Sequence, residues 1–252
     1  MRQNDDNPTL KTVAAALRHN RFDVHLVSTG AQAREKVLEI VPVGAVVGAG
    51  DSTTLREIRI WETLEARGTR VINPFTKELT LDPAQADLRR VALRDSLGQD
   101  VYLCSVNAVT LDGKLVSTDR VGNRVAGMVF GAPKVIVVVG RNKIVPDVEV
   151  ALKRIKDVIA PAHARWKGRR TPCATTGVCT DCSSLDRICG ITIIVEKRPH
   201  LTALSVVLVD EDLGLGWDPS WPTQRTAAIR GSYEEHTWAF TAQDGVGGLP
   251  TN

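Results

Sequence analysis

Apolar residues recur along the chain at two spacings, one typical of helices and one typical of strands. Near the start, Leu10, Val13, Ala14 and Leu17 share one face of a helix. The same reasoning predicts helices over residues 8–20, after Thr29, and over residues 52–66, 82–97, 122–130 and 146–159. Short apolar runs predict strands over residues 22–27, 44–48, 71–72, 101–106, 114–117, 135–139, 191–195 and 205–209. Helices and strands therefore alternate along most of the chain.

The strands consist of unbroken valine and isoleucine runs, not of alternating apolar and polar residues. Residues 135–139 read Val-Ile-Val-Val-Val, which places apolar side chains on both faces of the sheet. Strands covered on both faces occur mainly in parallel sheets with helices on each side. The chain is therefore predicted to have an α/β fold, with a mainly parallel sheet flanked by helices.

The chain changes character after Gly214. Trp217, Trp221 and Trp238 are three of the five tryptophans, and they stand among prolines and glycines. Such a segment does not suit a sheet, and its aromatic residues favour packing against the domain or against a second subunit of a homo-oligomer. We therefore divide the chain into an α/β domain, residues 1–214, and an aromatic C-terminal extension, residues 215–252.

Length and charge limit the classes of protein to which this chain can belong. With 252 residues, of which 43% are hydrophobic, the chain can bury a large core. A net charge of +3, from lysines and arginines scattered along the chain, argues against nucleic-acid binding. No apolar run reaches the length of a membrane span, and the polar start of the chain is unlike a signal peptide. The expectation is a soluble cytoplasmic protein.

Four of the five cysteines lie within one short stretch. They are Cys173, Cys179, Cys182 and Cys189. Thiolates this close repel one another unless a metal or a disulfide neutralises them, and structural disulfides are rare in a reducing cytoplasm. A metal centre in a cysteine-rich loop, residues 171–190, is therefore predicted. The fifth cysteine, Cys104, lies within an apolar strand and is expected to be a packing residue.

An iron–sulfur cluster is favoured over zinc for this centre. The pair Cys179 and Cys182 is half of a zinc ribbon, but the second close pair that such a ribbon needs is missing. Cys173 and Cys189 stand singly on either side, which suits a 4Fe-4S cluster with ligands from one loop. Zinc is the alternative. Arg187 can offset the negative charge of the thiolates, and nearby hydroxyl groups can donate hydrogen bonds to sulfur.

Two further loops can bind an anion. Ser52, Thr53 and Thr54 follow a strand and begin a helix, where amides and hydroxyls favour a carboxylate or phosphate; helix capping explains them equally well. Arg141 and Lys143 directly follow the most apolar strand. In open α/β sheets such strand ends line the ligand crevice, so both residues are candidates for binding a substrate carboxylate.

A turn at Gly113 separates two short predicted strands. If these strands pair as a hairpin, Asp112, Lys114, Asp119 and Asn123 can converge on one crevice. Turn formation and helix capping are the alternative roles of these residues.

Three segments of the α/β domain, taken together with the cysteines, form a specific combination. They are Asn107-Ala-Val-Thr-Leu-Asp-Gly113, Asp119-Arg-Val-Gly-Asn-Arg124 and Gly131-Ala-Pro-Lys-Val-Ile-Val-Val-Val-Gly-Arg-Asn-Lys143. Over residues 8–214 the chain resembles the lactate-utilisation (LUD) domain family, and its cysteine segment resembles that of the single-domain branch. The resemblance implies the fold shared by coenzyme A transferases and ribose-5-phosphate isomerase. The aromatic extension departs from the family pattern.

The resemblance also implies oxidation of lactate or a similar small hydroxycarboxylate beside iron–sulfur partner proteins. It favours functional roles for Asn107, Asn123 and Lys143. The cluster would relay electrons to a flavin or second cluster on a partner, because the chain lacks a nucleotide-binding fingerprint. Two alternatives stay open: a self-contained lyase or hydro-lyase that uses the cluster as a Lewis acid, and a noncatalytic subunit with a structural metal.

Overall fold

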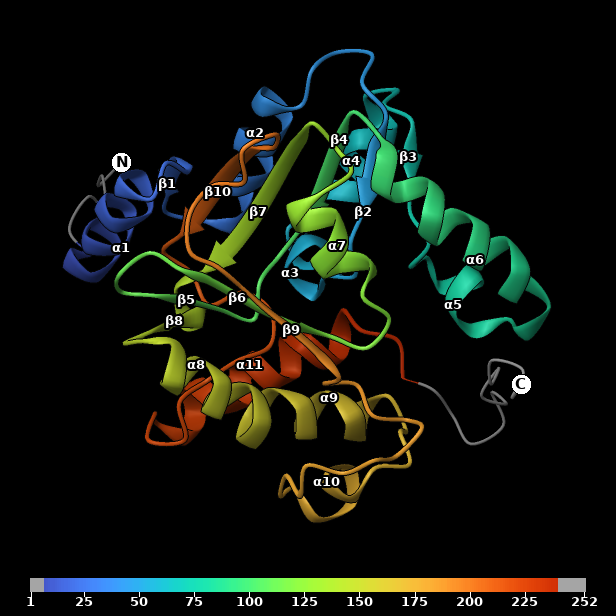
Figure 1. The fold of residues 1–252 in the computed structure, drawn as a ribbon, viewed down its shortest axis with the longest axis vertical. Coiled ribbons are helices and arrows are strands. Elements are labelled where there is room, and N and C mark those ends of the chain that lie inside the picture. The colour runs from blue at the N-terminus through green and yellow to red at the C-terminus, as the bar shows by residue number, and fades with distance from the viewer. Residues whose placement is uncertain (1–6, 240–252) are drawn as a thin grey trace.

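The computed structural model describes residues 7–239. Its α-helices are α1 (Pro8–His19), α2 (Gly30–Ile40), α3 (Thr53–Glu57), α4 (Ile60–Ala66), α5 (Lys77–Leu81), α6 (Ala86–Asp95), α7 (Asn123–Val129), α8 (Val148–Arg154), α9 (Ala160–Trp166), α10 (Pro172–Thr176) and α11 (Thr223–Glu235). Its strands are β1 (Asp23–Val27), β2 (Val47–Ala49), β3 (Val71–Ile72), β4 (Val101–Cys104), β5 (Ala108–Thr110), β6 (Leu115–Asp119), β7 (Lys134–Gly140), β8 (Ile144–Val145), β9 (Ile191–Val195) and β10 (Ala203–Val209). Figure 1 shows α8, α9 and α11 together below the strands.

The larger sheet holds six parallel strands in the order β1-β10-β7-β4-β2-β3. Successive residues of β7 enter different hydrophobic clusters on its two faces. Val135, Val137 and Val139 pack with residues of α1, whereas Ile136 and Val138 pack with residues of α2 and α4. All five are fully buried. Burial on both faces explains the unbroken apolar run, and the predicted α/β fold with a mainly parallel sheet is confirmed.

A smaller sheet has the order β8-β5-β6-β9. Its strands β5 and β6 form a hairpin around the turn at Gly113. The first strand of this hairpin is β5, which was not predicted, whereas the predicted strand of residues 101–106 becomes β4 of the larger sheet. Gly113 has a φ of 80°, and a Cβ atom there would lie 2.6 Å from Leu17 N. The turn therefore needs glycine both for its conformation and for its close approach to the end of α1.

Two predicted helices have different ends in the structure. The helix expected over residues 52–66 breaks into α3 and α4, because Arg59 adopts a left-handed φ of 55°. The helix expected to end near residue 159 continues through the π-helical segment Ile155–Ile159 into α9. Pro161 lies at the start of α9 and has no N–H to donate, and the wider π-helical turn accommodates this missing bond.

The segment after Gly214 packs against the domain. Leu215 and Trp217, together with Ile229 and Tyr233 of α11, are buried in one hydrophobic cluster with residues of α8 and the π-helical segment. The guanidinium of Arg225 lies 3.6 Å from the centroid of a tryptophan ring in the same segment. The sequence pattern did not predict α11. The rest of the aromatic extension, residues 240–252, lies outside the described residues.

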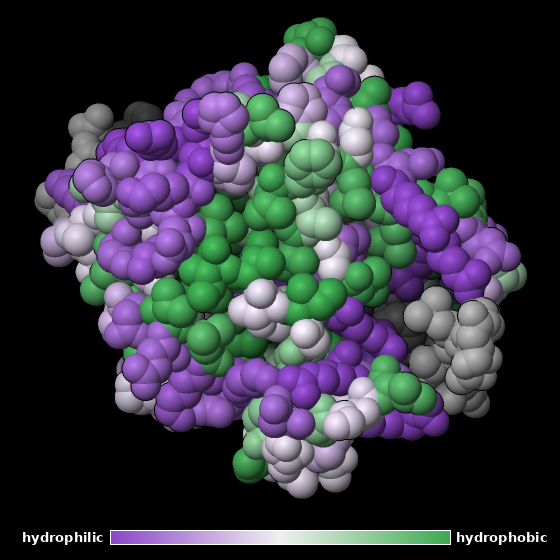
Figure 2. Space-filling model, viewed as in Figure 1, coloured by the Kyte–Doolittle hydropathy of each residue, from purple (hydrophilic) through white to green (hydrophobic). Residues whose placement is uncertain are grey.

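Figure 2 shows hydrophobic surface gathered in the middle of the face that carries α7 and β9. Val121, Phe130, Ile191 and Ile194 are exposed large hydrophobic residues of these elements and their flanks. Strand β9 is also an edge strand of the smaller sheet. Within residues 7–239, no helix combines the length and the apolar character that crossing a membrane requires.

Candidate functional site

Adjacent parallel strands place the polar segments that follow them at one edge of the larger sheet. The strands β10, β7, β4 and β2 are neighbours and run in the same direction, so their carboxyl ends lie side by side. The loops that follow them carry Thr54, Ser105, Lys143 and Glu211. This edge is where open α/β sheets bind ligands.

The amine of Lys143 joins three of these loops. Its Nζ donates hydrogen bonds of 2.8 Å to Thr54 Oγ1 and 2.8 Å to Ser105 Oγ. Ser105 Oγ in turn donates to the carbonyl oxygen of Val138 at 2.7 Å, in the neighbouring strand β7. Lys143 is only 4% exposed. Thr54 and Lys143 were predicted as anion-binding residues of two separate loops, and the structure brings their side chains into direct contact.

Burial sets the charge of this amine. It lowers the pKa of Lys143 to about 7, while the Glu57 carboxylate opposes the shift and Arg124 reinforces it. Burial also raises the pKa of Glu57, whose carboxylate accepts hydrogen bonds from Gly214 N at 2.6 Å and Ser232 Oγ at 2.9 Å. An amine that titrates near neutral pH can hold an anion when charged and accept a proton when neutral.

The lowered pKa of Lys143 has a consequence for stability. Between about pH 7 and its ordinary pKa of 10.5, the unfolded chain binds one more proton at this residue than the folded protein does. Because of this difference in bound protons, the free energy of unfolding rises with pH. We therefore expect the stability of the wild type, relative to Lys143→Met, to increase from about pH 7 to about pH 9 in urea unfolding. The exposed control Lys153→Met should keep the wild-type profile. Parallel profiles for wild type and Lys143→Met would contradict a buried, titrating lysine.

Arg124, near the start of α7, links the smaller sheet to the Lys143 edge. Its guanidinium donates to the carbonyl oxygen of Ser105 at 3.0 Å, to that of Thr118 at 2.6 Å, and to Asn107 Oδ1 at 3.2 Å. Asn107 Oδ1 also accepts a hydrogen bond from Thr118 N at 2.8 Å. The structure thus places Asn107 as a residue that positions Arg124, whose charge acts on Lys143.

The first residues after β10 close over Lys143. A Cβ atom at Gly214 would lie 2.3 Å from Thr54 Oγ1 and 3.0 Å from Lys143 Nζ, so the backbone passes directly beside the amine. Gly214 also has a φ of 70°, which favours glycine. The amide of Asn142 holds the turn by donating to the carbonyl oxygens of Gly214 and Gly216, both at 3.0 Å. A ligand that approaches Lys143 from this side must displace the Gly214 turn.

Two residues of the predicted anion loop have other contacts. Ser52 accepts a hydrogen bond from Leu55 N at 3.2 Å and so caps α3. This is the capping role that the sequence left open. The hydroxyl of Thr53 lies 2.8 Å from that of Thr237, which connects α3 to the segment after α11.

Arg141 and Asn123, two other predicted site residues, differ in whether their side-chain polar groups have partners. The guanidinium of Arg141 forms ion pairs with Asp210 at 3.3 Å and Asp212 at 3.0 Å, so two carboxylates already engage its charge. The backbone carbonyl of Asn123 accepts a hydrogen bond from the Tyr102 hydroxyl at 3.4 Å. Within residues 7–239, the buried Nδ2 of Asn123 has no hydrogen-bond partner, which is unusual for a buried donor.

The hairpin separates four residues that were expected to converge. Asp112 and Lys114 form an ion pair of 3.0 Å at the turn, beside the end of α1, where Asn20 donates to the Asp112 carbonyl. Asp119 ends β6 and accepts a hydrogen bond from Arg124 N at 3.0 Å. Because the whole of β6 lies between the two groups, they are at opposite ends of the strand. The prediction that these residues converge on one crevice is therefore wrong.

Sequence reasoning missed Ser105, Glu57 and Arg124. Ser105 directly follows β4 just as the turn before Lys143 follows β7, and this shared position at strand ends could have identified it. Glu57 and Arg124 reach the site from α3 and α7. Their contacts depend on how these helices lie against the sheet, which no spacing in the sequence specifies.

A second buried group of charges lies next to the same edge. Burial opposes ionisation of Asp51, but the positive charges of Arg56 and Lys167 lower its pKa to about 2. Both terminal nitrogens of Arg56 donate to Asp51 Oδ1 at 2.8 Å. Burial lowers the pKa of His163 to about 3, so its ring is neutral at pH 7, and its Nδ1 contacts the hydroxyl of Tyr233.

The four clustered cysteines lie in the loop that follows α9 and includes α10, at the bottom of Figure 1. Their side chains are half-buried, and none forms a disulfide. The hydroxyl of Thr171 lies 3.3 Å from Cys173 Sγ. Arg187 donates to the carbonyl oxygen of Cys182 at 2.6 Å and to Asp181 at 2.7 Å. The hydrogen bond to Asp181, and then the nearby thiols, raise the pKa of Arg187.

The thiols are not gathered into a metal site in this conformation. Among residues 7–239, no three His, Cys, Asp or Glu side chains lie close enough together to hold one metal ion. The donor set nevertheless suits an iron–sulfur cluster or zinc, because four free cysteines occur in one surface loop with an arginine beside them. Binding therefore requires the loop to rearrange, as is common where ligands assemble only with their metal.

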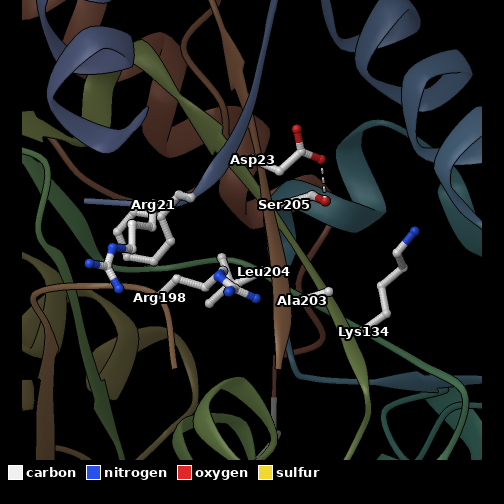
Figure 3. A pocket seen from close by; sticks show the side chains of 8 residues that line it. Arg21, Asp23, Lys134, Arg198, Ala203, Leu204 and Ser205 are labelled. Carbon is white, nitrogen blue, oxygen red and sulfur yellow. Dashed lines mark hydrogen bonds between the residues drawn. The ribbon is translucent and has the colours of Figure 1, made fainter. Parts of the chain in front are cut away.

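A cavity of about 470 Å³ lies at the opposite edge of the larger sheet, where β1, β7 and β10 begin. Figure 3 shows Arg21 and Arg198 on one side of it and Lys134 pointing away from them, so the cations do not converge. Asp23 accepts a hydrogen bond from Ser205 at 2.8 Å inside it. This cavity contains none of the predicted site residues.

Comparisons with known proteins agree with the sequence motifs. The sequence model of the LUD domain matches residues 10–209. The structure is similar to that of a DUF162 family protein from Deinococcus radiodurans, with 15% identity, a TM-score of 0.45, and coverage of 80% of this chain and 96% of the other. It is also similar to ribose 5-phosphate isomerase A from Neisseria gonorrhoeae, with 18% identity, a TM-score of 0.32, and coverage of 47% and 54%. No curated protein sequence matches the chain.

Proposed function

This chain belongs to the LUD domain family, and on that basis we propose that it binds a small hydroxycarboxylate, such as lactate, and takes part in its oxidation. Membership of the family favours a function related to lactate utilisation. We assign substrate binding to the Lys143 edge and electron transfer to a cluster held by the cysteine-rich loop. Redox partner proteins would accept the electrons.

The observation that carries this proposal is the buried amine of Lys143 at the carboxyl edge of the sheet. Few lysines are buried without a functional reason, because removing their charge from water is costly. Thr54 and Ser105 fix the position of Nζ, and the neighbouring Arg124 adds a second positive charge. A carboxylate placed here would gain charge-assisted hydrogen bonds. In its neutral form the same amine can accept the proton of a substrate hydroxyl.

We assign Cys173, Cys179, Cys182 and Cys189 as the ligands of the 4Fe-4S cluster. When bound, such a cluster accepts and passes on single electrons. Arg187 would remain beside the ligands and offset part of their negative charge. Zinc bound by the same four thiols would make the loop a structural element, and the chain a noncatalytic subunit.

Lys143→Met tests the substrate site. We expect this variant to bind lactate or glycolate about 1.5–3 kcal/mol more weakly than the wild type, the range for a hydrogen bond to a charged group, which corresponds to roughly 10–150-fold in Kd. Isothermal titration calorimetry measures the difference. Iron content should not change, since Lys143 lies outside the cysteine-rich loop.

Lys153→Met is the matched control, because Lys153 is exposed on α8 and pairs with Asp157. It should bind hydroxycarboxylates as the wild type does. If a folded Lys143→Met protein binds hydroxycarboxylates with wild-type affinity, the substrate site does not lie at this edge of the sheet.

A further inference from the structure

Gly214 lies at the boundary between two hydrophobic clusters. Leu213, the residue before it, packs with Leu55 of α3 and with residues of α4 and the larger sheet. Leu215, the residue after it, packs with Trp217, with α11 and with the π-helical segment. Gly214 itself has a φ of 70°, which glycine adopts without strain. The chain therefore passes at Gly214 from the core of the larger sheet into a separate apolar cluster.

Polar contacts join α3 to the residues that follow this boundary. We call residues 214–237 the α11 segment, and in Figure 1 the helix α3 lies between the strands of the larger sheet and α11. Arg56 Nε donates to the carbonyl oxygen of His236 at 2.8 Å. The hydroxyls of Thr53 and Thr237 lie 2.8 Å apart. Hydrogen bonds therefore connect α3 to the end of the α11 segment.

Glu57 of α3 contacts both ends of the α11 segment. Its carboxylate accepts a hydrogen bond of 2.6 Å from Gly214 N, where the segment begins, and one of 2.9 Å from Ser232 Oγ, near the end of α11. The negative charge of the same carboxylate acts on Lys143. One side chain thus holds the α11 segment in place beside the candidate substrate amine.

The junction between α3 and the α11 segment is suited to opening. Hydrogen bonds that break there are replaced by hydrogen bonds to water, so opening costs less than separating either hydrophobic cluster. Asn142 holds the carbonyl side of the Gly214 turn, and the opening therefore separates this turn from α3 on the side of Glu57. A glycine at the boundary tolerates the change in backbone angles that such a motion requires.

We propose that the α11 segment is a lid over Lys143, that Glu57 is its latch, and that a ligand enters between α3 and this segment. Because Lys143 is buried and the Gly214 turn lies directly beside Nζ, the lid is closed in this structure. The identity of the ligand, a small hydroxycarboxylate, rests on the proposed function. The lid adds the entrance to that site and a role for the first part of the aromatic extension.

Chemical labelling of lysine amines measures whether the entrance is closed. Acetic anhydride reacts with neutral amines, and at about pH 9 an amine with a pKa of about 7 is almost fully neutral. The exposed Lys153, whose hydrogen bond to Asp157 raises its pKa, is then mostly charged. An accessible Lys143 would therefore react faster than Lys153. We expect the lid to make it react more slowly, as mass spectrometry of the labelled peptides measures; a faster reaction in the wild type would overturn the proposal.

Ser232→Ala removes one hydrogen bond of the latch and leaves Lys143 and the Gly214 turn unchanged. We expect Lys143 to react at least about tenfold faster in this variant, because the closed lid loses a hydrogen bond to a charged group. Thr226→Ala is the matched control on the same helix, since the Thr226 hydroxyl donates to the carbonyl oxygen of Thr223 at 3.0 Å. Its Lys143 should react at the wild-type rate.

Gly214→Ala opens the lid by a different route. The added methyl group would lie 2.3 Å from Thr54 Oγ1, so the turn must move away from α3, and Lys143 should react faster. Alanine is also strained at this φ, and Gly68→Ala supplies that strain alone. Gly68 has a φ of 80°, and no heavy atom of residues 7–239 lies within 4 Å of a Cβ added there. Its Lys143 should react as in the wild type.

Unchanged labelling of Lys143 in both Ser232→Ala and Gly214→Ala would overturn the proposal. Hydrogen exchange of the β7 amides that accelerates as much as the labelling would do the same, because the whole domain would then open. Titration calorimetry of the same variants with lactate separates the lid from the proposed function. Faster labelling without lactate binding supports the lid and contradicts the hydroxycarboxylate site, whereas lactate binding with unchanged labelling contradicts the lid alone.

Discussion

Replacing Cys179 or Cys182 by serine is expected to abolish the visible absorbance at about 400 nm and to reduce bound iron to background. The two-residue spacing lets one turn present both sulfurs to a single centre, so the loss of either removes a ligand that the rest of the loop cannot supply. Iron and sulfide analysis of protein purified without oxygen, together with its absorbance spectrum, measures the effect.

Cys104→Ala is the matched control for this experiment. Cys104 is fully buried in β4, and burial raises the pKa of its thiol to about 12, so it stays protonated and does not serve as a thiolate ligand. The variant should retain wild-type iron. Full iron content in both Cys179→Ser and Cys182→Ser would refute the assignment. A colourless wild type with one bound zinc would show that the loop holds zinc and not a cluster.

The larger sheet could be predicted because burial on both faces requires an apolar residue at every position of a strand. Residues 135–139 meet this requirement, and β7 lies in the middle of the sheet. Helix ends were harder to predict. Ile58 and Ile60 are both buried although only Arg59 separates them, and the left-handed turn at Arg59 accommodates both. No glycine or proline signals that turn.

The helix α11 could not be predicted for a different reason. Only Ile229 and Tyr233 are buried along it, so its apolar pattern is too sparse to predict a helix from periodicity. Besides these two residues, polar groups contribute contacts, such as the hydroxyl of Ser232 that donates to Glu57. Contacts of this kind depend on the position of the whole helix and leave no periodic trace in the sequence.

The candidate site was predictable where chain geometry alone places residues together. Thr54 lies in the first turn of a helix that follows one strand, and Lys143 follows another strand. Parallel strands bring such positions to one edge. Glu57 and Arg124 were not predictable, because they reach Lys143 from helices whose orientation depends on the packed core. The cysteine-rich loop presents the opposite case. Its sequence identifies four candidate ligands, but within residues 7–239 no three of them lie close enough together to hold one metal ion, so spacing alone does not specify how they are arranged.

Conversion of a hydroxycarboxylate by the purified chain is expected to stop completely when no electron acceptor is present. Oxidation of the hydroxyl carbon to a carbonyl releases electrons that must leave the protein in every turnover, whereas a cluster acting as a Lewis acid returns to its starting state without an acceptor. Lactate is incubated with the protein, with and without an artificial acceptor dye, and the keto acid and any dehydrated product are quantified.

The two roles of the cluster predict opposite results in this assay. For an electron relay, keto acid forms only with the dye or a partner protein, and Lys143→Met lowers its yield while leaving the cluster spectrum intact. For a lyase, a dehydrated product forms without the dye, and the substrate perturbs the spectrum of one iron. Because a Lewis-acid iron needs an open coordination position, the lyase also requires one of the outer cysteines, Cys173 or Cys189, not to be a ligand. Substitution of that cysteine by serine would then leave the iron content unchanged, whereas a relay with four protein ligands loses iron in both variants.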